Sequence, residues 1–162
     1  LERDDKVRIL DADALNIIAG EHIDYKGSRE GQIIITPHIM EMSRLTGKTA
    51  ADIKEHMIES AKEYAIQHSC ICILKDARTV VTDGQKVYIN CTGNDGMSTG
   101  GCGDVLTGLI AGMTAMGLDA FEAACLSVYV HGKAGDYAAS GKGRAGMTAA
   151  DISEAIAYVM KR

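Results

Sequence analysis

Short runs of apolar residues bounded by turn-forming residues predict the β-strands of this chain. The runs at 32–36 and 70–74 are almost continuously apolar, which is typical of strands covered on both faces of a sheet. Further strands are expected at 6–10, 80–82 and 85–89. Asp83 and Gly84 separate the last two runs and predict a tight hairpin turn between them.

Longer segments with apolar residues at helical spacing predict the helices. A helix is expected over 49–68, where a Thr-Ala-Ala-Asp capping sequence precedes the first apolar positions. The segment 105–116 is apolar on almost every side, which predicts a central buried helix. Two more helices are expected at 119–138 and 152–160. Because strands and helices alternate, residues 1–162 are predicted to form one α/β domain, with a mainly parallel sheet and helices on both faces.

The composition narrows the class of protein. The chain has 162 residues, of which 46% are hydrophobic and 24% charged, as in an ordinary globular domain. A net charge of −5 and the lack of a long basic run argue against a nucleic-acid-binding surface. No apolar stretch is long enough to span a membrane, and the segment 1–6 is too charged for a signal peptide, so we expect a cytoplasmic protein.

The cysteines do not predict a metal site. There are five of them, and their spacing matches no zinc motif. Cys70 and Cys72 are two residues apart in an expected strand, so both side chains should face the same way as small core residues.

A glycine-rich loop that leads into the helix at 105–116 predicts an anion-binding site. Glycine allows the backbone to curl and lets a ligand approach it closely, and the first turn of a helix has amides without intrahelical partners. The helix dipole adds partial positive charge there, so the amides of Gly100, Gly101, Cys102 and Gly103 are expected to form an anion hole. The loop is neither a Walker A sequence nor a dinucleotide-binding GxGxxG.

Asp104 is the expected catalytic residue of this loop. One interpretation is a plain N-terminal helix residue whose carboxylate is attracted by the dipole. The other is a general base that takes a proton from an attacking hydroxyl while the amides hold the phosphoryl group. We favour the second, because a helix cap does not require the surrounding Thr-Gly-Gly-x-Gly run.

These residues resemble a known family. The runs Asn94-Asp-Gly-Met97 and Thr99-Gly-Gly-Cys-Gly-Asp-Val-Leu-Thr-Gly108 are similar to the signature of the ADP- or ATP-dependent NAD(P)H-hydrate dehydratases, members of the ribokinase-like superfamily. The family usually has threonine where this chain has Cys102. The resemblance extends over nearly the whole chain, and implies nucleotide-binding roles for Asn94 and Gly103.

The resemblance also implies an activity. In the family, ADP or ATP phosphorylates the ring hydroxyl of hydrated NADH or NADPH, and loss of phosphate restores the dinucleotide, with Mg²⁺ bridging the nucleotide phosphates. Two alternatives stay open: a small-molecule kinase of the same superfamily, acting on a sugar or vitamin precursor, and a nucleotide-binding fragment without turnover. Asp104 would contact the substrate in either enzyme.

Asp11 and Asp13 follow the first expected strand. Open α/β sheets place ligand groups at the carboxyl ends of their strands, although either acid alone is also a plausible helix cap. The family has a similar Asp-Ala-Asp-Ala-Leu-Asn run beside its substrate site. We therefore expect Asp11 to contact substrate and Asp13 to cap the helix.

The run Thr36-Pro-His38-x-x-Glu41 follows the second expected strand. A single histidine after a proline is commonly a turn residue. The family has a similar Thr-Pro-His-Pro-Gly-Glu run, in which the histidine contacts the hydrated nicotinamide, so the resemblance implies a substrate-binding role for His38. Glu41 matches the acidic position of the superfamily near the phosphates and magnesium.

The segment Lys75-Asp76-Ala77-Arg78-Thr79 follows the third expected strand. Cations at such a turn are usually solvated, but beside a phosphate site they would neutralise a nucleotide. The equivalent Lys-Gly-Ala-Arg-Thr segment of the family lines the adenine nucleotide site. Asp76 stands in place of the glycine and adds negative charge, which predicts weakened nucleotide binding.

Family members are longer on the amino-terminal side, where further strands lie. The resemblance therefore implies that the N-terminal part of the fold is absent, so that the chain is either a truncated piece or one part of a two-chain enzyme. A sheet lacking strands exposes an edge. We expect a homo-oligomer, or association with a chain that supplies the missing part.

Overall fold

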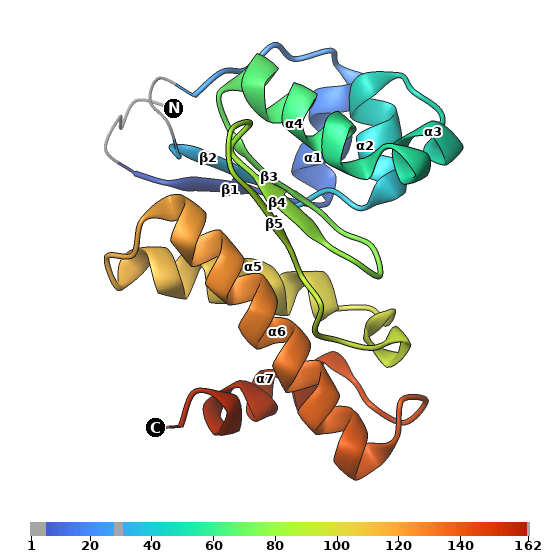
Figure 1. Cartoon of the computed structure of the whole chain (residues 1–162), viewed down its shortest axis with the longest axis vertical. Helices are drawn as coiled ribbons and strands as arrows, with labels where there is room; N and C mark the ends of the chain where they lie inside the picture. Colours follow the sequence, from blue (N-terminus) through green and yellow to red (C-terminus); the bar gives the residue numbers. More distant parts are fainter. Residues whose placement is uncertain (1–5, 28–30, 162) are drawn as a thin grey trace.

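The computed structural model describes residues 6–27 and 31–161; the charged residues 1–5, considered above against a signal peptide, lie outside it. A five-stranded sheet forms the centre of the fold (Figure 1). Its order is β1-β2-β3-β4-β5, so the strands lie side by side in the order in which they occur along the chain. The strands are β1 (Arg8–Leu10), β2 (Ile33–Ile35), β3 (Ile71–Leu74), β4 (Val80–Thr82) and β5 (Val87–Ile89), all within the predicted runs.

The sheet is mixed, so the prediction of a mainly parallel sheet was wrong. β1 pairs with β2 and β2 with β3 in parallel, whereas β3–β4 and β4–β5 are antiparallel. The reason is the short connection between β3 and β4, because a parallel pair needs a crossover of a dozen or more residues. The predicted hairpin at Asp83 and Gly84 is confirmed, and Gly84 has the positive φ of 98° that favours glycine.

Helices cover both faces of the sheet, as predicted (Figure 1). The first four helices along the chain cover one face of the sheet and the next two cover the other, whereas the last packs against those two helices, farther from the strands. The helices are α1 (Asp13–Gly20), α2 (Ile39–Thr46), α3 (Ala50–Glu55), α4 (Met57–His68), α5 (Cys102–Ala115), α6 (Ala120–Lys142) and α7 (Ala149–Val159). None of these described helices is long and apolar enough to cross a membrane.

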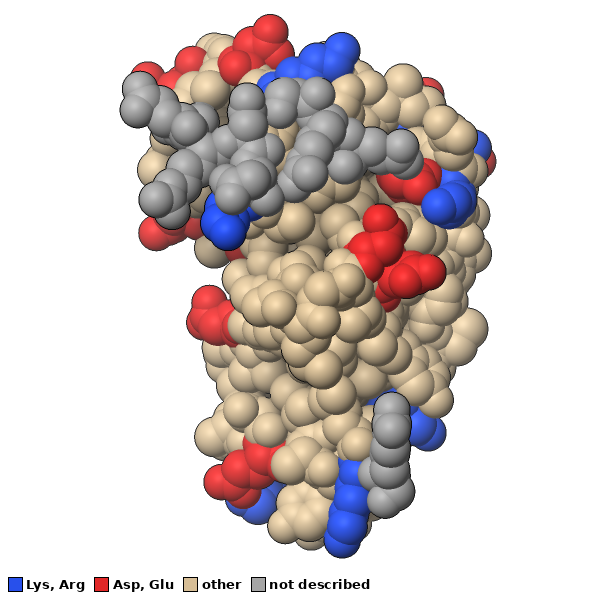
Figure 2. Space-filling view, turned by 90° about the vertical axis from the view of Figure 1, so that its left-hand side faces the viewer, with Lys and Arg blue, Asp and Glu red and all other residues tan. Residues whose placement is uncertain are grey.

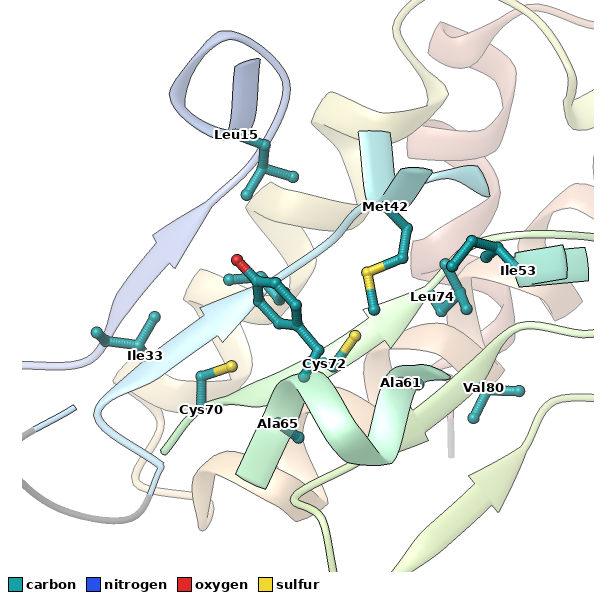
Figure 3. Packing of buried hydrophobic residues seen from close by; sticks show 12 residues of the cluster. Leu15, Ile33, Met42, Ile53, Ala61, Ala65, Cys70, Cys72, Leu74 and Val80 are labelled. Atoms are coloured by element: carbon teal, nitrogen blue, oxygen red, sulfur yellow. The ribbon is translucent and has the colours of Figure 1, made fainter. Parts of the chain in front are cut away.

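Alternate strand residues fill two separate cores. Ile33, Ile35 and Leu74 pack with residues of α1 to α4, including Leu15, Met42 and Ile53 (Figure 3). Cys70 and Cys72 belong to this same core, which confirms that they face the same way. Ile34, Ile71 and Ile73 point to the opposite face, where the partners on the helices are Leu106, Ile110, Ala124 and Val128. The parallel strands are therefore buried on both faces.

Helix boundaries and burial differ from the prediction in three places. The expected helix 49–68 is interrupted at His56, and the buried positions keep helical spacing across the break, so the apolar pattern does not reveal it. α5 buries only Cys102, Leu106, Ile110 and Met113, so the helix expected to be buried on all sides packs along one face. α6 continues to Lys142 instead of ending at Ala138.

The charged side chains are spread over the surface. Figure 2 shows the face on the left of Figure 1, and in its described part the basic side chains form no continuous patch. Much of the middle of this face carries no charge.

Candidate active site

The carboxyl ends of the parallel strands bring Asp11 and Lys75 together. Leu10 pairs with Ile35 in the β1–β2 ladder, so the residues that follow the strands emerge at one edge of the sheet. Lys75 Nζ lies 3.1 Å from Asp11 Oδ1, and Thr107 Oγ1 of α5 donates to Asp11 Oδ2 at 2.9 Å. One carboxylate thus joins the ends of two strands to the first turns of α5.

These contacts set the protonation of Asp11. Burial alone would raise the pKa of this carboxyl, but the Lys75 ammonium and hydrogen bonds from Thr36, Lys75 and Thr107 hold it below its ordinary value. Asp11 is therefore an anion at neutral pH. Asp13 is the first residue of α1 and not its cap, which corrects the prediction: the N-cap is Ala12, at a positive φ of 48°, and its amide donates to Asp11 Oδ1 at 2.9 Å.

The start of α5 presents several amides that have no partner among the described residues. Its N-cap, Gly101, has a φ of 89°, a conformation that favours glycine. Among the described residues, no carbonyl accepts the amides of Gly100, Gly101, Gly103 or Asp104, and only the Cys102 amide has one, the Thr99 carbonyl at 3.4 Å. A Cβ built on Gly103 would lie 3.6 Å from Asp11 Oδ2 and 3.7 Å from Lys75 Nζ, so the amide end of the helix lies beside the Asp11–Lys75 pair. This geometry suits an anion.

Asp104 is exposed in the first turn of α5. Its carboxylate makes no hydrogen bond or ion pair with any described residue, including the amides of its own helix. The geometry therefore gives no support to the alternative in which Asp104 only caps the helix, and it leaves the carboxylate available to a ligand.

A cavity of about 900 Å³ opens next to this helix start. That volume lies within the range of sites for nucleotide-sized ligands. Of the residues predicted to bind substrate, nucleotide or anion, the cavity is lined by His38, Lys75, Asp76, Ala77, Arg78, Thr79, Asn94, Cys102 and Gly103. Gly100, Gly101, Asp11, Glu41 and Asp104 do not line it.

The cavity carries both signs of charge. Arg78 is exposed and makes no ion pair or hydrogen bond with a described residue, so its guanidinium is available to a phosphate. Lys75 is already paired with Asp11. Asp76 is exposed on the same segment without an ion-pair partner, while Asp95 pairs with Arg144 at 3.0 Å.

His38 and Glu41 form a capping box at the start of α2. The His38 Nδ1 atom accepts from the amides of Met40 and Glu41, and the His38 amide donates to Glu41 Oε2 at 2.8 Å. His38 Nε2 lies 3.5 Å from Glu41 Oε1. Glu41 is buried, and both of its oxygens face His38 and not the cavity, so this carboxylate does not fit a direct magnesium contact as arranged. The described residues contain no group of three His, Cys, Asp or Glu side chains placed to hold a metal ion.

Asp136 holds the loop that closes the cavity, and the sequence did not point to it. Its Oδ2 accepts from the Gly93 amide at 3.0 Å and its Oδ1 from Asn94 Nδ2 at 3.1 Å. Asn94 belongs to a contiguous sequence motif, but Asp136, with which its side chain bonds, lies 42 residues further along the chain. The sequence feature that could have indicated Asp136 is its place, as a polar residue, on the face of α6 that contains the glycines.

Two glycines of α6 receive the same loop. A Cβ on Gly132 would overlap the Thr92 hydroxyl and lie 2.7 Å from the Thr92 carbonyl carbon, and a Cβ on Gly135 would overlap Met97. The lack of side chains at these two positions therefore allows the loop to pack closely against α6.

His131 also lines the cavity, and no sequence motif pointed to it. It is 9% exposed, and its Nε2 atom has no hydrogen-bond partner among the described residues. Burial lowers the pKa of His131 to about 4 and Lys75 acts in the same direction, whereas the Cys102 backbone opposes the shift. The imidazole is therefore neutral at physiological pH.

Comparison with known proteins gives the site its family context. Residues 1–158 match the family described as NAD(P)H-hydrate dehydratase. The chain is 48% identical over 155 residues to the bifunctional NAD(P)H-hydrate repair enzyme Nnr of Moorella thermoacetica, covering 94% of this chain and 29% of that protein.

Solved structures agree with this match. The ADP/ATP-dependent NAD(P)H-hydrate dehydratase of Bacillus subtilis, co-crystallised with ATP and Mg²⁺, superposes with a TM-score of 0.82 at 30% identity, over 93% of this chain and 53% of that one. A ribokinase-like superfamily protein from Enterococcus faecalis V583 superposes with a TM-score of 0.84 at 26% identity, over 98% of this chain and 54% of that one. The chain thus has the ribokinase-like α/β fold, and spans about half the length of these structures. It belongs to the NAD(P)H-hydrate dehydratase family.

Proposed function

We propose that residues 1–162 form part of one ribokinase-like domain that repairs hydrated NADH or NADPH at the expense of ADP or ATP. The observation that supports this most directly is the start of α5. There, the amides of Gly100, Gly101, Gly103 and Asp104 have no partner among the described residues, and Gly103 lines the same cavity as the segment 75–79. A nucleotide bound in the cavity would direct its phosphates to these amides.

Phosphoryl transfer at this site needs positioning and charge neutralisation more than covalent chemistry. Lys75 and Arg78 would neutralise the phosphates, and the amides of the anion hole would hold the transferring group. Asp104 would take the proton of the ring hydroxyl while the hydroxyl oxygen attacks the terminal phosphorus of the nucleotide. The bond from that phosphorus to the rest of the nucleotide would break. Elimination then breaks the carbon–oxygen bond, releases phosphate, and removes a proton from the neighbouring carbon to restore the double bond.

His38 and Asp11 would face the dinucleotide. Nδ1 of His38 already accepts two amides, so the ring can meet substrate only through its Nε2 edge, and the side chain is 49% exposed. Asp11 is held by Lys75 and Thr107, so we assign it to orienting the site around a substrate hydroxyl or amide. Both remain proposals drawn from the resemblance.

Magnesium would enter as the counter-ion of the nucleotide phosphates. Magnesium commonly keeps several waters and binds through phosphates and one or two carboxylates. Both oxygens of Glu41 face His38, so Glu41 is not arranged to hold such an ion.

A further polypeptide would complete the domain at β1. Among the described residues, this strand is an edge of the sheet and pairs with β2 alone. Ile17 of α1 and Met116, which follows α5, are 56% and 71% exposed. We propose that a second copy of the chain, or a polypeptide equivalent to the additional part of the relatives, covers this edge.

The test is to incubate the chain, alone and with the additional segment of a relative, with hydrated NADH and ADP or ATP. Recovery of NADH absorbance with stoichiometric phosphate release is the expected result. Asp104→Asn should abolish turnover and leave ADP affinity unchanged. Glu122→Gln, which changes an exposed acid in the first turn of α6, is the matched control and should leave both unchanged.

Other outcomes would point elsewhere. A stable phosphorylated product from a panel of sugars and vitamin precursors would indicate a kinase. Nucleotide binding without turnover, even with the additional segment, would indicate a non-catalytic fragment. Full activity in Asp104→Asn would remove Asp104 from its role.

A further inference from the structure

One residue that lines the cavity has no task in the steps above. His131 lies on α6 and is 9% exposed, and its Nε2 atom is buried without a hydrogen-bond partner among the described residues. A buried polar atom left unpaired is destabilising, so native proteins rarely keep one without a ligand or a water to satisfy it.

The surroundings of His131 are apolar on one side. Val128 is one helical turn earlier on α6, and Leu106 of α5 packs in the same core as Val128; all three residues line the cavity. Lys75 and Arg78, on the segment after β3, supply cations to the cavity, and Lys75 is near enough to His131 to lower its pKa. The side of the cavity formed by Val128 and Leu106 suits an uncharged part of a ligand, with a single polar group to orient it.

The state of the ring supports the same conclusion. The imidazole is neutral because burial, the largest effect, and the positive charge of Lys75 both lower its pKa. A neutral imidazole offers one donor and one acceptor, and the ring is held next to the backbone of Cys102 at the start of α5. A group bound there would lie close to phosphates held by the anion hole.

We propose that His131 is a nucleotide-binding residue that hydrogen-bonds an uncharged polar group of the nucleoside, on the ribose or on the edge of the base. It thereby contributes to the choice of nucleotide, while the phosphates are held by the amides and cations. This inference rests on the proposed nucleotide-dependent function.

The first experiment compares nucleotide affinities. His131→Leu removes the polar group and is expected to weaken ADP binding about tenfold, the equivalent of one good hydrogen bond. His131→Gln keeps a polar group and should recover part of the loss. Pyrophosphate, which has phosphates and no nucleoside, should bind equally well to all three proteins. His56→Gln, at an exposed position between α3 and α4, is the control and should bind ADP like the wild type.

Analogues identify the partner group. The affinities of the wild type and of His131→Leu are compared for 2′-deoxy-ADP, 3′-deoxy-ADP and inosine diphosphate. One of these analogues should lack the group that His131 bonds, and the two proteins should bind that analogue equally well. A loss that is the same for ADP and every analogue, or that extends to pyrophosphate, would overturn the proposal.

A spectroscopic measurement on the unaltered chain covers the case in which the variants do not fold. The imidazole ¹⁵N resonances of His131 should shift when ADP is added, while those of His56 and His68 stay in place. ADP binding without any shift at His131 would overturn this inference alone. No binding of ADP in the presence of the additional segment would overturn the proposed function, and this inference with it.

Discussion

Lys75 Nζ lies 3.1 Å from Asp11 Oδ1, although 64 residues separate them. The pair joins the end of β3 to the end of β1, with β2 between them in the sheet. Both side chains are largely shielded, with exposed fractions of 22% and 13%. Because removal of one partner leaves the other charge uncompensated, the pair should matter more to stability than an exposed ion pair.

The first prediction concerns this pair. Asp11→Asn should lower the free energy of unfolding by about 1–3 kcal/mol, because it removes the counter-charge of Lys75 and an acceptor of Thr107. Urea denaturation at neutral pH measures the change. Asp24→Asn, at an exposed position without an ion pair, is the control and should leave the midpoint in place. Equal midpoints for the wild type and Asp11→Asn would show that the pair contributes nothing.

The second prediction concerns Asp76, the acid in the segment that lines the cavity. Asp76→Asn removes a negative charge near the expected phosphates without changing the backbone. ADP affinity should rise about threefold at low ionic strength, and the gain should shrink as salt is added. Calorimetric titration at two salt concentrations measures both effects, again with Asp24→Asn as the control. A gain that does not depend on salt would argue against a charge effect.

The third prediction compares two glycines of α6. Gly132→Ala should destabilise the protein by at least about 2 kcal/mol, because the new methyl group meets the backbone of Thr92. Gly141 has open space around the position of a Cβ, so Gly141→Ala should be neutral or stabilise by up to about 1 kcal/mol. Thermal unfolding of the two variants gives the comparison. If both change stability alike, the close contact between Gly132 and the loop is not limiting.

The fourth prediction concerns acid pH. The pKa of His131 is about 4 in the folded protein and near 6.5 in the unfolded chain, so the unfolded chain binds more protons between these values. The contribution of His131 to the free energy of unfolding is therefore fully present above pH 6.5. It is lost as the pH falls toward 4, which lowers the free energy of unfolding by roughly 3 kcal/mol. The lowered pKa of Asp11 acts in the same direction at lower pH.

The pH prediction is checked with denaturation curves from pH 4 to 8 without nucleotide. His131→Gln has no titrating side chain at this position, so its stability should fall less steeply between pH 6.5 and 4. Parallel curves for the two proteins would mean that His131 titrates normally when folded.

The sequence predicted the local elements around the cavity. The strands, the hairpin, and the loops at 75–79 and 94–103 depend on apolar runs, turn residues and glycines that are contiguous in the chain. Contacts between distant segments were not predictable in this way. The bonds from Asp136 to Gly93 and Asn94 and the placement of His131 depend on how α6 crosses the loop.

The errors have a similar origin. The direction of β4 depends on the length of its connection to β3, and the apolar run alone gives only the existence of a strand. The composition of α5 is apolar on almost every side. A helix is buried on all sides only if other elements pack against each of them, and among the described residues only one face of α5 is covered. Apolar residues around the break at His56 keep the same period, so the interruption leaves no trace in the pattern.

The agreement between strand order in space and in the chain has a consequence for assembly. Every ladder joins strands that are successive in sequence, so no pairing has to wait for a strand to be inserted between two others. Such a sheet can grow by addition at either end, and a neighbour arriving beside β1 would leave all four existing ladders as they are. A polypeptide that contributes more strands therefore need not be covalently continuous with this one for the sheet to extend.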